Sequence, residues 1–267
     1  MPKEFPYIAN TLAISVTLGL LRSAESLDRS STLSVELSSS SFLILMHLTR
    51  RHSWDLSPSE AIALQQELRR EVVSDRPIDL DAVELVAGVD VSVKNEQSQA
   101  AIVVVTYPGF LPVETVLAQR PTPFPYVPGL LSFREGPVLE EAFEKLKSEP
   151  DVFLFDGMGI AHPRRIGIAS HMGLWLERPT IGCGKTLLCG RYKDLGEEKG
   201  SAAPLIDKKE TIGVALRTRT AKNPMFISPG HLADIPTAAE LVLRCSPKYR
   251  LPEPIRLAHN AAGQFSP

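Results

Sequence analysis

The succession of apolar runs along the middle of the chain constrains its fold more than any other feature. Three strand-like runs, at residues 84–93, 100–107 and 113–118, follow one another across short polar turns, which is the pattern of an antiparallel meander. From residue 129 onward, helical and strand-like periodicities alternate. A meander followed by alternating helices and strands predicts a mixed β-sheet that is covered by helices on both faces.

The alternating segments are expected as a helix at 129–147, a strand at 152–155, a helix at 166–176 and a strand at 180–184. With the meander, the order is βββαβαβ, which is the layout of a ribonuclease H-like α/β fold. Further elements are expected around this unit: a helix at 58–73 that begins with a capping box at 57–60, strands at 211–217 and 224–228, and helices at 236–245 and 254–262.

Residues 1–50 differ in character from the rest of the chain. Residues 30–41 are rich in Ser, Thr and Leu and lack the periodicity of a helix or strand, and Met46 stands just ahead of the first ordered pattern. We therefore expect residues 1–50 to be a poorly ordered extension or an artefact of start-site assignment. Residues 51–267 are expected to form the functional domain.

The composition of the chain limits the kinds of molecule that it is expected to bind. The formal net charge of −2 and the pI of about 6.3 exclude a protein that coats nucleic acid through overall positive charge, so such binding needs a local basic patch and a metal ion at the phosphate. The chain has no apolar run of 18 residues, and its three cysteines show neither a disulfide framework nor zinc spacing. No membrane partner is therefore expected, and the reducing cytoplasm is the expected compartment.

Three acidic residues stand where acids are uncommon. Asp90 lies inside the apolar run 84–93, Asp156 ends the apolar strand 152–155, and Glu135 falls early in a helix. A carboxylate beside a core strand is costly unless it is paired or bound to a metal. The two strands are neighbours in a ribonuclease H-like sheet, so we expect the acids to converge on Mg²⁺ or Mn²⁺, which activates water for phosphodiester cleavage.

Each acid has a simpler interpretation if it is taken alone. Asp90 can accept hydrogen bonds from backbone amides at a sheet edge, and Asp156 can cap the next helix. The presence of all three acids at these places favours the metal site.

Six stretches of the sequence together resemble a known family. They are GVD (88–90), FPYVPGLLSFRE (124–135), DGMGIAHPR (156–164), IASHMG (168–173), SPGH (228–231) and RLAH (256–259). The resemblance is to the endonuclease V family and extends over roughly residues 54–259. Residues 1–50 have no counterpart in the family pattern.

The resemblance implies an active site of four residues. Asp90, Asp156 and Glu135 would bind Mg²⁺, for which Mn²⁺ substitutes. His259 is the fourth residue, and a neutral imidazole there would orient the water or assist proton transfer. Without the resemblance, His259 reads as a solvent-facing residue of the C-terminal helix.

The resemblance also implies a wedge and a base pocket. Tyr126, between Pro125 and Pro128, is the expected wedge that fills the gap left by an extruded base, although the segment taken alone is only a rigid loop. The pocket for a flipped hypoxanthine is expected to be lined by Gly129, Leu131, Gly157, His162 and Ile168. His162 has the alternative of a structural histidine that is bonded to a carboxylate.

Basic residues are expected to contact the phosphates. Lys185 is expected near the scissile phosphate as a point charge. Arg164, Arg165, Arg191 and Lys193 fall on the segments around the same site and would add phosphate contacts, which weaken with salt.

The function that the resemblance implies is that of a monomeric, Mg²⁺-dependent DNA repair endonuclease. It would recognise deaminated bases, chiefly deoxyinosine, and hydrolyse the second phosphodiester bond 3′ to the lesion. Three alternatives stay open: an inosine-specific endoribonuclease with the same site, a non-cleaving binder of damaged or branched nucleic acid, and another ribonuclease H-like nuclease such as a resolvase.

Overall fold

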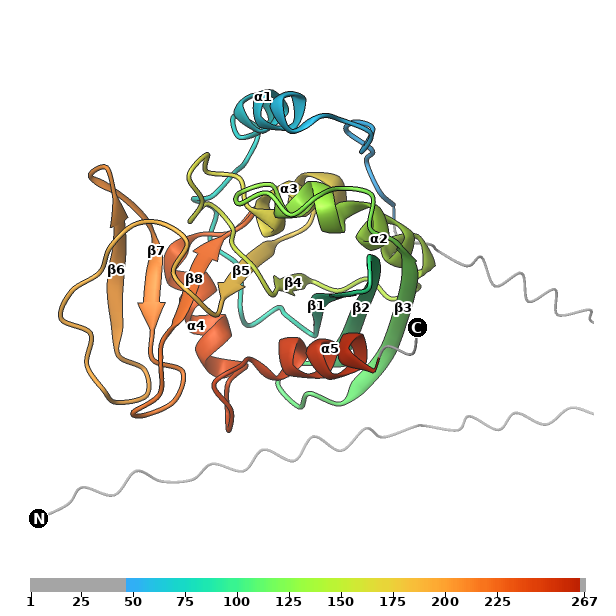
Figure 1. The fold of residues 1–267 in the computed structure, drawn as a ribbon. Coiled ribbons are helices and arrows are strands. Elements are labelled where there is room, and N and C mark those ends of the chain that lie inside the picture. The colour runs from blue at the N-terminus through green and yellow to red at the C-terminus, as the bar shows by residue number, and fades with distance from the viewer. Residues whose placement is uncertain (1–46, 265–267) are drawn as a thin grey trace, which may run out of the picture. The chain divides into compact units, whose positions relative to one another are not determined.

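The computed structural model describes residues 47–264 (Figure 1). The N-terminal extension that the sequence predicts at residues 1–50 therefore lies outside the described residues, except for residues 47–50. Within the described chain, none of the helices has the length and hydropathy of a membrane span.

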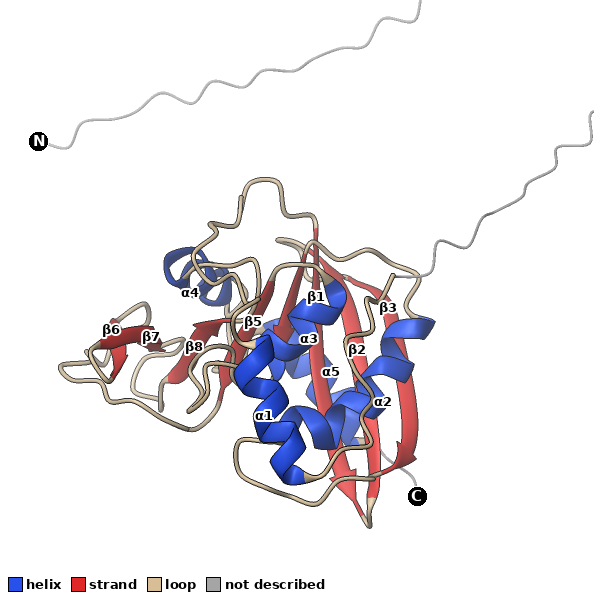
Figure 2. Cartoon of the chain, turned by 90° about the horizontal axis from the view of Figure 1, so that it is seen from above, coloured by secondary structure: helices blue, strands red, loops and turns tan. Residues whose placement is uncertain are grey.

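The strands of the described chain form one eight-stranded sheet in the order β3-β2-β1-β4-β5-β8-β7-β6 (Figure 2). They are β1 Leu85–Lys94, β2 Gln97–Thr106, β3 Pro112–Pro121, β4 Val152–Phe155, β5 Thr180–Gly184, β6 Ala202–Asp207, β7 Glu210–Leu216 and β8 Met225–Pro229. The first three strands pair antiparallel, whereas β1, β4 and β5 pair parallel. This mixed sheet confirms the predicted ribonuclease H-like order.

Helices cover both faces of the sheet, which confirms the second part of the fold prediction (Figure 1). They are α1 Pro58–Leu68, α2 Leu131–Lys145, α3 Ile168–Leu176, α4 Ile235–Arg244 and α5 Glu253–Gly263. Helices α2 and α3 pack on one face, and α4 and α5 pack on the other.

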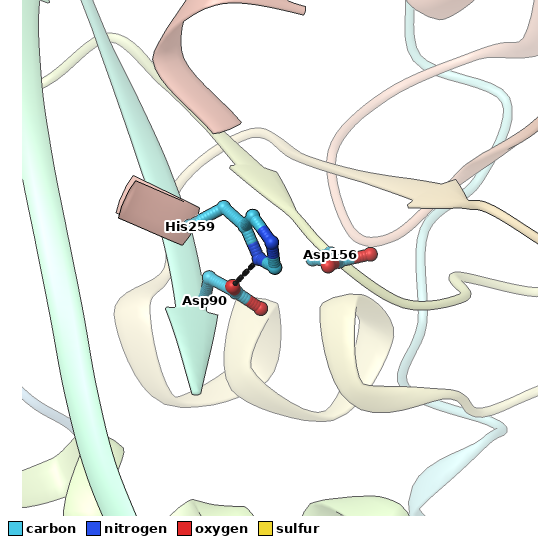
Figure 3. A group of neighbouring side chains, drawn as sticks. All are labelled: Asp90, Asp156 and His259. Atoms are coloured by element: carbon cyan, nitrogen blue, oxygen red, sulfur yellow. Dashed lines mark hydrogen bonds and ion pairs between the residues drawn. The ribbon is translucent and has the colours of Figure 1, made fainter. Parts of the chain in front are cut away.

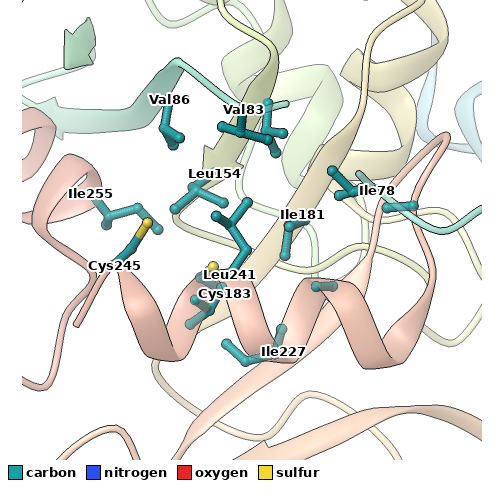
Figure 4. Packing of buried hydrophobic residues seen from close by; sticks show 14 of the residues in the cluster. Ile78, Val83, Val86, Leu154, Ile181, Cys183, Ile227, Leu241, Cys245 and Ile255 are labelled. Atoms are coloured by element: carbon teal, nitrogen blue, oxygen red, sulfur yellow. The ribbon is translucent and has the colours of Figure 1, made fainter. Parts of the chain in front are cut away.

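A separate layer of buried side chains fills the space on each face. Under α2 and α3, this layer includes Phe143, Phe153 and Trp175. Under α4 and α5, it includes Leu154 and Leu241 (Figure 4). Strand β4 contributes to both layers because successive side chains point to opposite faces, and this explains why its sequence is apolar throughout.

Helix α1 and strand β6 depart most from the sequence prediction. α1 begins at the predicted capping box, but it ends at Leu68 instead of residue 73. Val72 packs in the same cluster as Leu68, so the apolar spacing continues past the end of the helix. The sequence pattern does not predict β6, because Pro204 interrupts it; as the last strand of the sheet, β6 tolerates proline.

Candidate active site

Asp90 and Asp156 extend from neighbouring parallel strands. Val89 in β1 is paired with Phe155 in β4, and the Asp156 amide donates to the Val89 carbonyl at 3.0 Å. The two acids therefore lie at the same level of the sheet (Figure 3). Asp156 does not cap the next helix, because the N-cap residue of α3 is Gly167.

His259 joins the two aspartates from α5. Its Nδ1 donates to Oδ2 of Asp90 at 2.7 Å, and one ligand atom each of Asp90, Asp156 and His259 lie within 4.8 Å of one another (Figure 3). Close packing of α5 on β1 makes this approach possible, because a Cβ at Gly88 would collide with the Pro254 carbonyl. The His259 side chain is 52% exposed, but the bond to Asp90 fixes its ring and leaves Nε2 of the neutral form with a free lone pair.

Glu135 lies in the second turn of α2 and lines the same cavity as the two aspartates. Among the described residues, its carboxylate stands apart from the group of three ligand atoms. Burial, followed by the negative charges of Asp90 and Asp156, raises the pKa of Glu135 well above its ordinary value. Burial and the charge of Asp156 also raise the pKa of Asp90 to about 6, although the hydrogen bond from His259 lowers it.

The donor set fits a hard divalent cation. Lys185 pairs with Asp156 and compensates only part of the negative charge. Burial and the neighbouring negative charges raise the pKa of both Asp90 and Glu135, and a bound cation would offset both effects. Carboxylate oxygens at this charge density suit Mg²⁺ or Mn²⁺, and the imidazole of His259 is a suitable ligand for a transition metal.

A cavity of about 460 Å³ opens beside the acids. Besides the three acids, its lining includes most residues that the resemblance assigns to substrate binding: Tyr126, Pro128, Gly129, Leu131, Gly157, His162, Ile168 and Lys185. Pro125 is exposed and does not line the cavity. The lining further includes residues that the sequence does not single out, chief among them Gln65, Ser132, Met158, Ile166 and Leu188. Ser132 and Met158 fall within the stretches that carry the resemblance, whereas Gln65, Ile166 and Leu188 lie outside them, and no signal in a single sequence marks these three.

Tyr126 stands at the mouth of this cavity with 72% of its surface exposed. On either side of the loop, Phe124 and Leu130 are buried in one cluster, which fixes both ends of the segment. A rigid loop therefore presents an aromatic ring to solvent at the rim of the cavity.

His162 is engaged through both ring nitrogens. Its Nε2 donates to the Gly129 carbonyl at 3.0 Å, and its Nδ1 accepts from the Arg164 amide at 3.2 Å. Burial and the positive charge of Arg164 lower the pKa of His162 to about 4, so the ring is neutral at physiological pH. Its partners are backbone groups and not the carboxylate of the alternative interpretation.

Of the five basic residues expected at the phosphates, only Lys185 lines the cavity, and the others differ in how far their charges are compensated. Arg165 pairs with Asp207 at 2.8 Å and with Glu210 at 2.7 Å. Arg191 and Lys193 form no ion pair within residues 47–264, and Arg191 forms a β-bridge with Ile206 of β6.

Comparison with known proteins places the chain among close relatives. A family model described as Endonuclease V matches residues 66–260. Endonuclease V of Nostoc punctiforme is 49% identical over 219 residues, which are 81% of this chain and 99% of that protein.

Solved structures agree with this match. The crystal structure of Endonuclease V from Streptomyces avermitilis has a TM-score of 0.76 at 39% identity, and the alignment covers 82% of this chain and 96% of that one. Endonuclease V of Ciona intestinalis has a TM-score of 0.67 at 29% identity, with 77% of this chain and 96% of that chain covered. The Ciona protein is in complex with a 24mer DNA that contains an inosine followed by a ribo-adenosine.

Proposed function

The chain belongs to the endonuclease V family and is a metal-dependent nuclease, and from this premise we propose that it cuts DNA at deaminated bases, chiefly deoxyinosine. The cut falls at the second phosphodiester bond 3′ to the lesion, and the metal is Mg²⁺. The observation that carries the proposal is the meeting of Asp90, Asp156 and His259 beside a cavity that has Tyr126 at its mouth.

Asp90, Asp156 and Glu135 would hold the cation, which when bound supplies an activated water and stabilises the leaving oxygen. The bond to Asp90 uses Nδ1 of His259, which leaves Nε2 free to orient a water molecule or to receive its proton. Lys185, which follows β5, brings a positive charge beside Asp156 at the place where a phosphate would approach.

The cavity beside the acids would receive the extruded base. Leu130 provides no side-chain cap for α2, and within the described chain the amides of Leu131 and Ser132, which both line the cavity, have no backbone partner. Such amides donate to the O6 oxygen of hypoxanthine, whereas the amino group of adenine would face another donor. Tyr126 would fill the gap in the base stack.

A cleavage assay with matched duplexes tests the proposal. One duplex carries a single deoxyinosine and the other is undamaged, and each is incubated with Mg²⁺ or with EDTA. We expect one nick 3′ to the inosine, which disappears with EDTA and with the Asp156→Ala variant. Binding without a nick in Mg²⁺ would point to a non-cleaving binder, and cleavage of branched, undamaged DNA would point to a resolvase.

Inosine-containing RNA is a second candidate substrate. The Ciona relative was crystallised with a ribonucleotide directly after the inosine, so a relative with the same fold accepts a 2′-hydroxyl there. We expect that a strand with this single ribonucleotide distinguishes the candidates: faster cleavage than of the all-DNA strand favours RNA, and equal or slower cleavage favours DNA.

A further inference from the structure

Three N–H groups converge on one backbone carbonyl at the wall of the cavity. The Gly129 carbonyl accepts hydrogen bonds from Gln65 Nε2 at 3.0 Å, from His162 Nε2 at 3.0 Å and from Arg164 Nη2 at 2.8 Å. A carbonyl oxygen has two lone pairs, so protein donors use all its capacity. Gly129 directly follows the loop of Tyr126 and precedes α2. The orientation of this peptide therefore fixes the direction in which the loop joins the helix.

The side chain of Gln65 contacts both the Gly129 carbonyl and Arg164, which is another of its donors. Its side chain is 1% exposed, its Oε1 accepts from Arg164 Nε at 2.5 Å, and its Nε2 also donates to the Ile166 carbonyl at 3.4 Å. A buried amide whose oxygen and nitrogen are both engaged is held in one orientation. Arg164 forms no ion pair with an acid in the described chain, so Gln65 and the Gly129 carbonyl hold its guanidinium in place.

Gly129 is suited to this crowded position. Its φ of +81° lies in the left-handed region, and a Cβ there would stand 2.7 Å from Nη2 of Arg164. On the same side, Ala61 of α1 packs in one cluster with Phe124, which precedes the Tyr126 loop. Helix α1 therefore contacts both ends of the Tyr126 loop: its start through apolar packing and its end through the hydrogen bonds of Gln65.

We propose that Gln65 is a positioning residue for base extrusion. Acting through Arg164 and the Gly129 carbonyl, it holds the Tyr126 loop in the orientation that insertion into the base stack requires. This inference rests on the proposed function and extends it to a helix outside the sheet layers. Gln65 makes no hydrogen bond to the acids of the site, so its effect falls on capture of the base and not on the hydrolytic step.

The Gln65→Met variant keeps the length of the side chain but removes its donor and its acceptor. Gln66→Met is the matched control, because it makes the same change at the adjacent, exposed position of the same helix. We expect Gln65→Met to raise KM for the inosine duplex by about tenfold, the effect of losing a hydrogen bond to a buried carbonyl. The kcat and the Mg²⁺ dependence should stay within about twofold of the control.

A second readout follows extrusion without cleavage. A 2-aminopurine beside the inosine brightens when its neighbour leaves the stack, and in EDTA the rise should be smaller for Gln65→Met than for Gln66→Met. The Gln65→Glu variant retains an acceptor for Arg164 but loses the donor to Gly129, and we expect the same defect. The measurements are made at a temperature where circular dichroism shows all variants folded.

The outcomes separate this inference from the proposed function. Absence of cleavage by the wild-type protein in Mg²⁺ would reject the proposed function, whereas the fluorescence comparison in EDTA still judges Gln65. Equal KM and equal fluorescence rise for the Gln65 variants and the control would overturn the positioning role, even if the Gln65 variants melted at lower temperature. A wild-type protein that nicks the inosine duplex but produces no fluorescence rise would overturn the role of Gln65 in extrusion and leave the proposed cleavage standing.

Discussion

In the proposed metal site, the protonation of Asp90 and Glu135 would decide whether a cation binds. Burial and the charge of Asp156 raise the pKa of Asp90 to about 6, and a protonated carboxyl is not a ligand. A raised pKa means that the acid keeps its proton up to higher pH, so cation affinity is lost as the pH falls through about 6. We predict that Mn²⁺ affinity, measured by calorimetric titration, falls by about tenfold for each pH unit below this value.

The His259→Ala variant checks the sign of this effect. The hydrogen bond from His259 lowers the pKa of Asp90, so removing it should move the loss of affinity to higher pH. Mn²⁺ affinity that does not change across this pH range would contradict a metal site at Asp90.

Single residues also show what a sequence can and cannot reveal. Asp90 and Asp156 are visible because each interrupts or ends an apolar strand, where a charge needs a reason. His259 has no such context, and only its motif links it to the site. Gln65 carries no signal at all, since a glutamine in an amphipathic helix reads as an exposed residue until the structure shows it buried.

At the scale of elements, the contact between β1 and α5 sets the geometry of the site. A Cβ at Gly88 would collide with the backbone of Pro254, which has no flexible end that can move aside. We predict that Gly88→Ala displaces α5, lowers the free energy of unfolding by about 1–3 kcal/mol and weakens Mn²⁺ binding, because His259 moves away from Asp90. Urea denaturation and metal titration measure the two effects.

Gly263→Ala is the control for this prediction. Gly263 ends the same helix and has no atom within 4 Å of the position of a Cβ, so the same substitution meets open space. If Gly88→Ala were as stable as Gly263→Ala, the tight packing of α5 would not be what positions His259.

A helix or strand can be predicted from the local sequence pattern wherever its buried side chains recur with the spacing of that element. The meander and the fully apolar β4 are predictable because their side chains alternate between, or fill, two buried faces. The end of α1 is not predictable in this way, since Val72 packs beside Leu68 although it lies outside the helix. Strand β6 is not either, because only its place at the edge of the sheet makes Pro204 acceptable.

At the scale of the whole molecule, the site depends on both ends of the described chain. Asp90 and His259 are 169 positions apart, and Glu135 and Asp156 come from elements between them. The Tyr126 loop is in turn fixed by α1, which precedes the sheet in the sequence. A fragment that lacks α1 or α5 would therefore lose part of the proposed site.

The acid stability of this domain depends on histidines that are buried in the neutral form. The pKa of His162 is lowered to about 4 by burial and by the charge of Arg164, against 6.5 for an ordinary histidine. The unfolded chain therefore binds the proton more tightly than the folded one. The contribution of His162 to the free energy of unfolding is therefore complete above about pH 6.5, and it decreases as the pH drops toward 4.

Comparison with His162→Gln isolates this contribution, because a glutamine still offers a donor to the Gly129 carbonyl but does not titrate. Asp90 acts in the opposite direction, since its raised pKa favours the folded state on acidification, but it does so equally in both proteins. Between neutral pH and about pH 4.5, we predict that the wild-type protein loses about 2.5 kcal/mol more stability than the variant, measured by urea denaturation in EDTA. Equal losses would mean that His162 takes up its proton in the folded protein as readily as in the unfolded chain, so burial and the charge of Arg164 would not lower its pKa.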